Sequence, residues 1–447
     1  GGGFLAKRLK PKNYNFLTFK LNRKDNCKTI FNSIYMNKIY LDHSATTPVD
    51  KKVLEAMNPY FSDVFGNANS IHNFGQKALS GVDEAREQVA RFLNCEPSEV
   101  IFTSGATESD NLAIKGVARA LRDRGLRDMH IITTKVEHEA VLEPCKELEK
   151  EGIEVTYLPV KKNGEVSLAT FEAAIKDNTV LVSVMYVNSE VGIIEPIREI
   201  AKIIKKINDK RLREWEKRRP QERGDKPQPI YFHTDATQAI NFLNCDVQWN
   251  YIDLLSLSAH KIYGPKGIGA LYVRKGTPIV SLQKGGRQEK KLRSGTLNVA
   301  GIVGLGAAVA QIDSKNQEKN NAKLLKLRDI LIKGLLKSIP DSILNTDLDN
   351  SSPSHAHFTF PGAEGESILI SLDLEGIAIS TGSACAAGSL EPSHVLLAMG
   401  IPAEIAHSSV RFTLGKYNTE AEIKKVIKIL PPIIKRLRKM NPLYKKN

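Results

Sequence analysis

The sequence predicts an α/β fold in which a large domain has a mostly parallel sheet and a smaller α+β domain follows. Two observations carry this prediction. Short apolar runs alternate with amphipathic segments from about residue 100 to residue 273, which is typical of a parallel sheet covered by helices. Beyond residue 300 the pattern changes to two long helical segments followed by shorter elements, which indicates a second domain.

The elements follow one another in a regular order. A short strand is expected at Lys38–Asp42, then helices at Pro48–Tyr60 and Gly81–Leu93, the latter with apolar residues at helical spacing. The strands expected next are Val100–Thr103, His130–Thr134, Glu154–Leu158, Val180–Val187, Ile230–Asp235, Ile252–Ser256 and Ile268–Val273. The helices expected among them are Glu108–Leu121, Ala140–Glu151, Leu168–Ile175 and Pro196–Ile207, and the second domain begins with helices at Gly301–Ile312 and Gln317–Leu336.

These elements divide the chain into four parts. Residues 1–37 form a basic extension, 38–56 a segment that joins the small domain, 57–299 the large cofactor-binding domain, and 300–447 the small C-terminal domain. Residues 205–228 are expected to be a charged insertion in the large domain, between the helix that ends near Ile207 and the strand at Ile230. A solvated surface extension is the favoured interpretation of this insertion, and partner docking is the alternative.

The basic excess of the chain lies at its two ends. The net charge is +14, of which residues 1–38 contribute +8 and residues 424–447 contribute +9, so that residues 39–423 carry −3. A basic, almost acid-free N-terminus with Phe and Leu predicts an organelle transit segment and hence the mitochondrial matrix or a related organelle. A disordered extension on a cytoplasmic protein is the alternative. Nucleic-acid binding is not expected, since no recognised motif accompanies the charge.

The cysteines and the apolar runs exclude other classes of protein. Five cysteines in 447 residues exclude a disulfide framework. The lack of any C-x-x-C spacing argues against a zinc ribbon or a redox pair. No metal site is therefore expected. The longest nearly apolar run, Ala300–Ala310, is too short to span a membrane. The composition favours a soluble intracellular protein.

Two stretches place reactive side chains directly after apolar strands. Lys261 follows one such strand, beside His260 and before a Gly-rich turn; a lysine held there can lose its proton and form a Schiff base. Asp235 ends another strand and can accept a protonated ring nitrogen, with Gln238 three residues further on. The alternative for Asp235 is a helix N-cap.

Two further stretches add an anion site and a thiol. Small residues at Thr103–Ser109 join a strand to a helix, where free backbone N–H groups bind phosphate; a plain capping box is the alternative. Cys385 lies in a run of Gly, Ala and Ser, which favours an exposed loop thiol over a structural one. A lysine, a carboxylate and an anion site are the requirements of pyridoxal phosphate.

In these stretches the sequence resembles the cysteine desulfurases of the iron–sulfur cluster type, which are pyridoxal-phosphate enzymes of the aminotransferase-like fold (fold type I). The resemblance covers about residues 38–443, and it rests on YLDHSATTPVD, FTSGATESDNLAIKG, VNSEVG, HTDATQA, SAHKIYGPKGIGALYVR, RSGTLNV, STGSACAAGSLEPSHVL and SSVRFTLG. It implies conversion of L-cysteine to L-alanine, with a persulfide on Cys385 that supplies sulfur for cluster assembly. Ser389–Ser393 matches the group with the long cysteine loop.

The resemblance also implies roles for residues within these motifs. Cys385, Lys261 and His138 would be catalytic: Cys385 as nucleophile, Lys261 as the Schiff-base lysine, and His138 stacked over the pyridine ring. Asp235 would hold the ring nitrogen. The other cofactor ligands implied are Ala106, Thr107, Asn188, Gln238, Ser258, His260 and, from a neighbouring subunit, Thr296; Asn188 and Arg411 would bind the substrate carboxylate.

The resemblance further implies a homodimer that works with an iron–sulfur scaffold protein and small accessory subunits. The enzymatic alternatives are a selenocysteine lyase or another class V aminotransferase-like enzyme. Three features depart from the family pattern: the insertion, Lys290-Lys291 in place of the usual Arg-Gly, and an end at Asn447 before the usual scaffold-binding tail. The lysine pair should not affect the chemistry. The basic C-terminal end is expected to replace the tail by steering an acidic partner.

Overall fold

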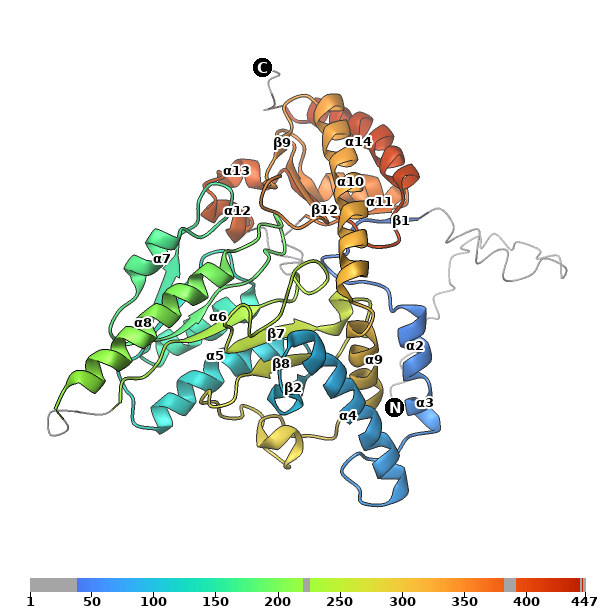
Figure 1. The fold of residues 1–447 in the computed structure, drawn as a ribbon. Helices are drawn as coiled ribbons and strands as arrows, with labels where there is room; N and C mark the ends of the chain where they lie inside the picture. Colours follow the sequence, from blue (N-terminus) through green and yellow to red (C-terminus); the bar gives the residue numbers. More distant parts are fainter. Residues whose placement is uncertain (1–37, 220–225, 382–390, 443, 445–447) are drawn as a thin grey trace, which may run out of the picture. The chain divides into compact units, whose positions relative to one another are not determined.

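A seven-stranded sheet organises the larger part of the chain (Figure 1). The structure, a computed structural model, describes residues 38–219, 226–381, 391–442 and 444. The strand order is β2–β8–β7–β6–β5–β3–β4, and β8 runs antiparallel to both of its neighbours while the other pairs are parallel. The strands are β2 Val100–Thr103, β3 His130–Thr134, β4 Glu154–Leu158, β5 Thr179–Ser183, β6 Tyr231–Asp235, β7 Leu254–Ser258 and β8 Gly269–Val273. The mostly parallel sheet is therefore confirmed.

Helices cover both faces of this sheet because successive strand residues point to opposite sides. In β2, Val100 and Phe102 belong to one core and Ile101 to the other. The first core lies under α4, α8 and α9, and the second under α5 and α6. The helices of this region are α2 Lys51–Met57, α3 Pro59–Ser62, α4 Asn73–Leu93, α5 Ala106–Asp123, α6 Glu139–Lys150, α7 Leu168–Ala174, α8 Ile197–Lys217 and α9 Val299–Val309.

A third core belongs to the smaller α+β part. Strands β9 Ile343–Leu344, β10 His355–Thr359 and β12 Ser409–Thr413 form an antiparallel sheet in the order β12–β10–β9. Beside it, β1 Ile39–Tyr40 pairs in parallel with β11 Ile377–Ala378, and Ile39 and Leu41 belong to this core. Helices α10 Ser314–Ser338, α11 Gly365–Leu374 and α14 Glu420–Met440 contribute to this core. Helices α12 His394–Ala398 and α13 Ala403–Ala406 contribute instead to a smaller apolar cluster with Val136 and Met185. The domain boundaries predicted from the sequence stay a prediction.

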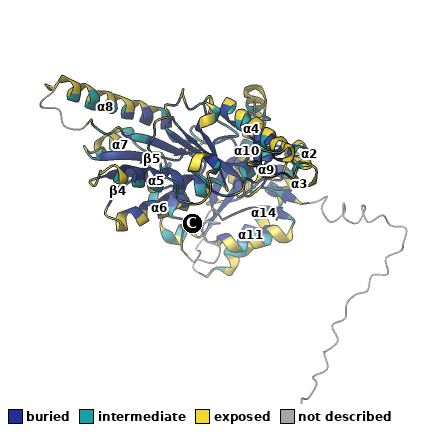
Figure 2. Ribbon diagram, turned by 90° about the horizontal axis from the view of Figure 1, so that it is seen from below, coloured by how far each residue is buried: buried dark blue, intermediate teal, exposed yellow. Residues whose placement is uncertain are grey.

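Two helices are longer than the apolar spacing predicted. Helix α4 begins at Asn73, eight residues before the expected start, after His72, which accepts a hydrogen bond from the Gly75 N–H as N-cap. Helix α8 does not end near Ile207 but continues to Lys217. Its outer turns are mostly exposed (Figure 2) and carry i,i+4 ion pairs, such as Lys205 with Asp209. Such pairs support a helix without an apolar face, so apolar periodicity could not reveal this end.

Two strands are shifted from their expected positions. Strand β7 spans Leu254–Ser258 rather than Ile252–Ser256, so that Ser258 is its last residue. Strand β5 ends at Ser183 rather than at Val187. Apolar residues continue beyond each strand into buried turns, and composition does not mark where the backbone pairing stops. Within the described part of the chain, no helix is both long and apolar enough to cross a membrane.

A strained turn lies at one of the departures from the family pattern. Glu289, Lys290 and Lys291 have positive φ angles of 41°, 57° and 68°, a conformation that costs a residue with a Cβ about 1–2 kcal/mol. The Glu289 carboxylate anchors the turn, because Arg86 Nη2 lies 2.6 Å from its Oε1. The backbone therefore keeps this shape whatever side chain follows Glu289.

Lys291→Gly should consequently raise the free energy of unfolding by about 0.5–1 kcal/mol, after the larger entropy of glycine in the unfolded chain is subtracted. Urea unfolding at neutral pH measures this value. Lys275→Gly is the matched control, since Lys275 is exposed and its φ is not positive; this change should lower stability by a similar amount. A loss of stability in the Lys291 variant would contradict the prediction.

Candidate active site

A cavity of about 700 Å³ lies where strand ends of the large sheet meet the start of α5 and strand β12 of the small sheet. The carboxyl ends of parallel strands share one edge, which is where α/β proteins bind their ligands. The structure brings nine of the predicted site residues to the walls of this cavity. They are Ala106, Thr107, His138, Asp235, Gln238, Ser258, His260, Lys261 and Arg411.

Three of these residues are positioned by strand ends. Strand β6 ends at Asp235, and β7 ends at Ser258 and leads into the short 3-10 turn Ala259–Lys261. The Asp235 Oδ1 atom accepts a hydrogen bond of 2.8 Å from the Thr237 N–H. None of the described helices begins directly after Asp235, so the N-cap interpretation was wrong.

Lys261 contacts a segment from the N-terminal part of the chain. Its Nζ donates to the carbonyl oxygen of Ala45 at 2.8 Å and also to that of Ser44. The Gln238 side chain donates to the same Ser44 oxygen at 3.0 Å. Sequence reasoning assigned no role to Ser44 or Ala45, although both lie in the YLDHSATTPVD motif. The motif was a signal, but only the fold shows that its backbone reaches Lys261.

The start of α5 forms one wall of the cavity. Gly105 is the N-cap and provides no side-chain cap, and Ser104, Gly105, Ala106 and Thr107 all line the cavity. The Glu108 carboxylate accepts from the Ser104 N–H at 2.6 Å and pairs with Arg293 at 3.0 Å. Part of the expected capping interaction therefore exists. This capping interaction is compatible with an anion site, because a helix N-terminus offers several N–H groups.

The two histidines of the cavity are oriented by hydrogen bonds. Burial, with the charges of Lys261 and Lys266 adding to it, lowers the pKa of His260 to about 4, so its ring is neutral at neutral pH. Its Nδ1 lies 3.1 Å from Thr46 Oγ1. His138 Nδ1 accepts from the Ala140 N–H at 3.1 Å. A neutral His138 therefore carries its proton on Nε2.

Arg411 enters the cavity from β12. Its Nη1 donates to the Ser189 carbonyl oxygen at 2.8 Å, and its Nη2 donates to Asp42 Oδ1 at 2.8 Å. The side chain of Arg411 is almost fully buried, yet the residue lines the cavity. A buried guanidinium with remaining N–H donors is suited to a carboxylate.

Two of the described residues that were predicted for the site are not brought to the cavity in this structure. Asn188 is fully buried and is not among the lining residues. Its amide donates to the Val136 carbonyl at 2.9 Å, and its Oδ1 accepts from two backbone N–H groups. These contacts place Asn188 behind the wall. Thr296 is exposed and does not line the cavity, and Cys385 lies outside the described residues.

A buried carboxyl that the sequence reasoning missed also lines the cavity. Asp110 lies in α5, and its Oδ1 is 3.5 Å from His233 Nε2. Burial raises the pKa of Asp110 well above its usual range, and the charge of Asp235 adds to this effect. Of two neighbouring carboxyls the more buried one keeps its proton, so Asp110 is neutral beside Asp235. Asp110 follows directly on the predicted anion motif, which was the available signal.

The cysteines in the described part of the chain are not suited to act as nucleophiles. Burial raises the pKa of Cys95, Cys145 and Cys245 to about 12. A thiol with such a pKa is not a thiolate at neutral pH, and the thiolate is the nucleophile. None of these three cysteines therefore competes with Cys385 for the predicted role.

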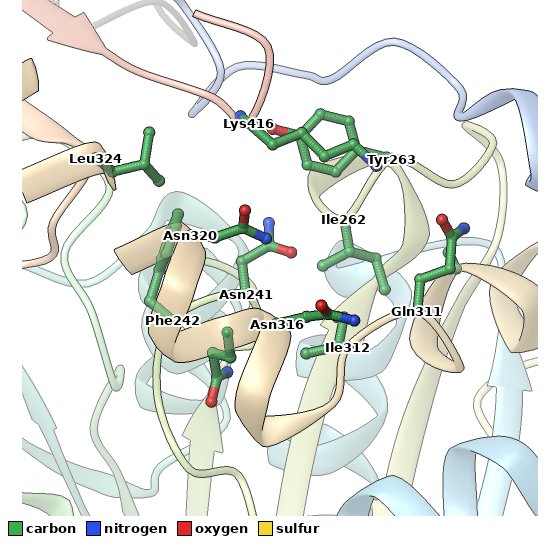
Figure 3. Close-up of a pocket in the computed structure, with 12 residues that line it drawn as sticks. Asn241, Phe242, Ile262, Tyr263, Gln311, Ile312, Asn316, Asn320, Leu324 and Lys416 are labelled. Carbon is green, nitrogen blue, oxygen red and sulfur yellow. Dashed lines mark hydrogen bonds between the residues drawn. The ribbon is translucent and has the colours of Figure 1, made fainter. Parts of the chain in front are cut away.

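A second cavity, of about 210 Å³, lies behind the backbone of Lys261. Figure 3 shows Asn241, Ile262, Gln311 and Asn316 among the side chains that line it, the last two from the α9–α10 region. Asn241 Nδ2 donates to the Lys261 carbonyl oxygen at 2.7 Å. The cavity thus adjoins the support of Lys261, but its walls are mostly amides and apolar groups and offer no arrangement for chemistry.

Comparison with known proteins places this site in a family. Residues 39–211 and 224–426 match the aminotransferase class-V family. The cysteine desulfurase IscS of Dictyoglomus turgidum is 48% identical over 405 residues, which cover 91% of this chain and 96% of that protein. This chain belongs to the cysteine desulfurase family of class-V aminotransferases.

Solved structures agree with this family assignment. A NifS-like protein superimposes with a TM-score of 0.77 at 37% identity, covering 90% of this chain and 99% of its own. A structure described as SspA in complex with cysteine gives a TM-score of 0.71 at 38% identity, covering 85% and 100%. The predicted aminotransferase-like fold is confirmed. The family match is interrupted at residues 212–223, within the segment that was expected to be an insertion.

Proposed function

We propose that this member of the cysteine desulfurase family uses pyridoxal phosphate to convert L-cysteine to L-alanine, with the sulfur transferred to Cys385 and passed on for iron–sulfur cluster assembly. One observation carries the proposal: Lys261, Asp235, the start of α5 and Arg411 line a single cavity. A lysine, a carboxylate, an anion site and a carboxylate anchor are the groups that an amino-acid reaction on this cofactor requires.

The residues present fit the cofactor. Asp235 would hold the pyridinium nitrogen, and Gln238 the phenolic oxygen. The start of α5, with Thr107, Ser258 and neutral His260, provides N–H and O–H donors for the phosphate. When bound, pyridoxal phosphate supplies an electron sink for the substrate α-carbon. The His138 ring, fixed by its bond from the Ala140 N–H, would lie over the cofactor ring.

Each remaining group has a defined task in this proposal. Arg411 would bind the substrate carboxylate, and the Lys261 amine would take the proton from the α-carbon. The Cys385 thiolate would attack the substrate sulfur, so that an S–S bond forms while the Cβ–S bond breaks. The electron pair left on Cβ would take up a proton, and Lys261 would return a proton to the α-carbon. The products are alanine and a persulfide on Cys385.

We further propose a homodimer located in the mitochondrial matrix or a related organelle. Thr296 is exposed and lies outside the cavity, which supports a role toward a neighbouring subunit. The basic residues 1–37 support import by their composition. The nine Lys and Arg at 424–447, without an acid, support docking of an acidic scaffold protein, and small accessory subunits complete the proposed assembly.

Cys385→Ser tests the proposed function. The variant, loaded with pyridoxal phosphate, should keep the visible absorbance of the bound cofactor but lose persulfide formation and alanine release from L-cysteine, because a hydroxyl cannot accept the sulfur. Wild type should form both products. Cys95→Ser is the control and should retain activity, since burial raises the pKa of the Cys95 thiol to about 12. A fully active Cys385→Ser variant, or an inactive wild type, would contradict the proposal.

A further inference from the structure

We propose that Asp42 is a positioning residue, which holds the Arg411 guanidinium in the orientation that receives the substrate carboxylate. The proposal rests on the proposed function of this cavity and goes beyond it by naming what aligns the carboxylate anchor. Asp42 Oδ1 lies 2.8 Å from Arg411 Nη2. Asp42 is not among the residues that line the cavity, whereas Arg411 is. Asp42 therefore acts through Arg411 and not on the substrate.

The backbone of Asp42 is itself well fixed. Its carbonyl oxygen accepts from the Tyr40 hydroxyl at 2.9 Å and from the Ala45 N–H at 3.0 Å. Asp42 also forms a β-bridge with Thr413, two residues after Arg411 on β12. The carboxylate is therefore held from a segment that is bridged to β12, so its position does not depend on a flexible side chain alone.

Some N–H donors of Arg411 bind protein groups, and the others remain for a ligand. A guanidinium has five N–H donors. One Nη1 donor goes to the Ser189 carbonyl oxygen and one Nη2 donor to Asp42, and two fixed bonds at different nitrogens define the plane of the group. Among the described residues, the buried Nε has no hydrogen-bond partner. The donors that remain can bind a carboxylate, and their direction depends on Asp42 and Ser189.

The same short segment also reaches Lys261. Three residues after Asp42, the carbonyl oxygen of Ala45 accepts from Lys261 Nζ at 2.8 Å. Segment Asp42–Ala45 thus links the anchor of the substrate carboxylate to the amine that would take the α-proton. A displacement of reacting groups by about 1 Å can cost about 100-fold in rate. Asp42 accordingly helps to set the separation between the carboxylate and the α-carbon.

Asp42→Ala should raise the KM for L-cysteine about tenfold or more, with a smaller fall in kcat. Asp42→Asn should recover most of the loss, because its amide oxygen can still accept from Nη2. Asp42→Ser, which is polar but too short to reach Nη2, should behave like the alanine variant. The dissociation constant of L-alanine should rise in the alanine and serine variants and stay near the wild-type value in the asparagine variant. Calorimetry on the pyridoxal-phosphate-loaded protein measures this constant without any turnover.

Asp329→Ala is the matched control. Asp329 pairs at 3.1 Å with another buried arginine, Arg328, in α10, and neither residue lines the cavity. The KM of the Asp329→Ala variant for L-cysteine should therefore stay within twofold of wild type. The inference is overturned if Asp42→Ala and Asp42→Ser keep KM and alanine affinity within twofold, or if Asp42→Asn loses as much as they do. Turnover of L-cysteine by the wild-type protein tests the proposed function separately. The affinity for L-alanine tests the role of Asp42 whether or not the protein turns over L-cysteine.

Discussion

Replacing Lys261 with alanine should lower alanine formation from L-cysteine by at least about 10³-fold. The Nζ of Lys261 is held in the cavity by the Ser44 and Ala45 carbonyl oxygens, and a positioned acid–base group contributes about 10²–10⁴-fold. Its loss as the amine that binds the cofactor adds to this effect. The visible absorbance of the covalently bound cofactor should disappear in the same variant. Steady-state alanine formation and the absorbance spectrum measure the two effects.

A second lysine makes the test of Lys261 specific. Lys266 also lines the cavity, but it is exposed and lies in the Gly-rich turn. Lys266→Ala should keep at least about a tenth of the wild-type rate and the absorbance of the bound cofactor. Comparable damage from both replacements would mean that the positive charge of the cavity, and not a reactive amine at Lys261, supports the reaction.

Glu195→Gln should make the protein more stable at high pH but not at low pH. Glu195 is almost fully buried, and burial raises its pKa to about 8. Its Oε2 accepts from the Val166 N–H at 2.9 Å. The folded protein therefore keeps this proton between pH 4.5 and about 8, while the unfolded chain releases it. Wild-type stability falls as the pH rises through this window, by about 1.4 kcal/mol for each pH unit.

A glutamine does not titrate, and its amide oxygen can still accept from Val166. The stability advantage of the variant should therefore grow from near zero at pH 4.5 to about 4–5 kcal/mol at pH 8. Urea unfolding of both proteins across this range measures the difference, and equal urea slopes check that the unfolded states are alike. A difference that stays constant with pH would show that Glu195 does not keep a proton in the folded state.

The chemistry of the site could be predicted residue by residue because it depends on which groups follow strand ends. Asp235 and Lys261 were predicted from their places after apolar strands, and each lines the cavity. An apolar run that stops marks the end of a strand to within a few residues, which is enough to place a side chain near the sheet edge. Helix ends are less visible: α8 continues to Lys217 on charged residues, since local ion pairs can extend a helix that buries no face there.

The contacts between segments far apart in the chain could not be predicted in this way. Asp42 and Arg411 are 369 residues apart, yet their side chains are 2.8 Å apart. Asn188 was expected at the cavity, but its side chain is occupied by the backbone around it. No local pattern encodes which backbone carbonyl a side chain meets, because that depends on how distant strands pair and how the hydrophobic cores pack.

The sequence by itself determined the fold class, the family and the identity of most reactive groups, because motif residues and strand periodicity are local properties. It also located the basic excess at the two ends of the chain. Only the tertiary structure decided that Asp110 shares the cavity with Asp235, that Lys261 is held by Ser44 and Ala45, and that Asp42 orients Arg411. Burial and hydrogen-bond geometry arise when separate segments meet, and they decide the charge state and direction of each group.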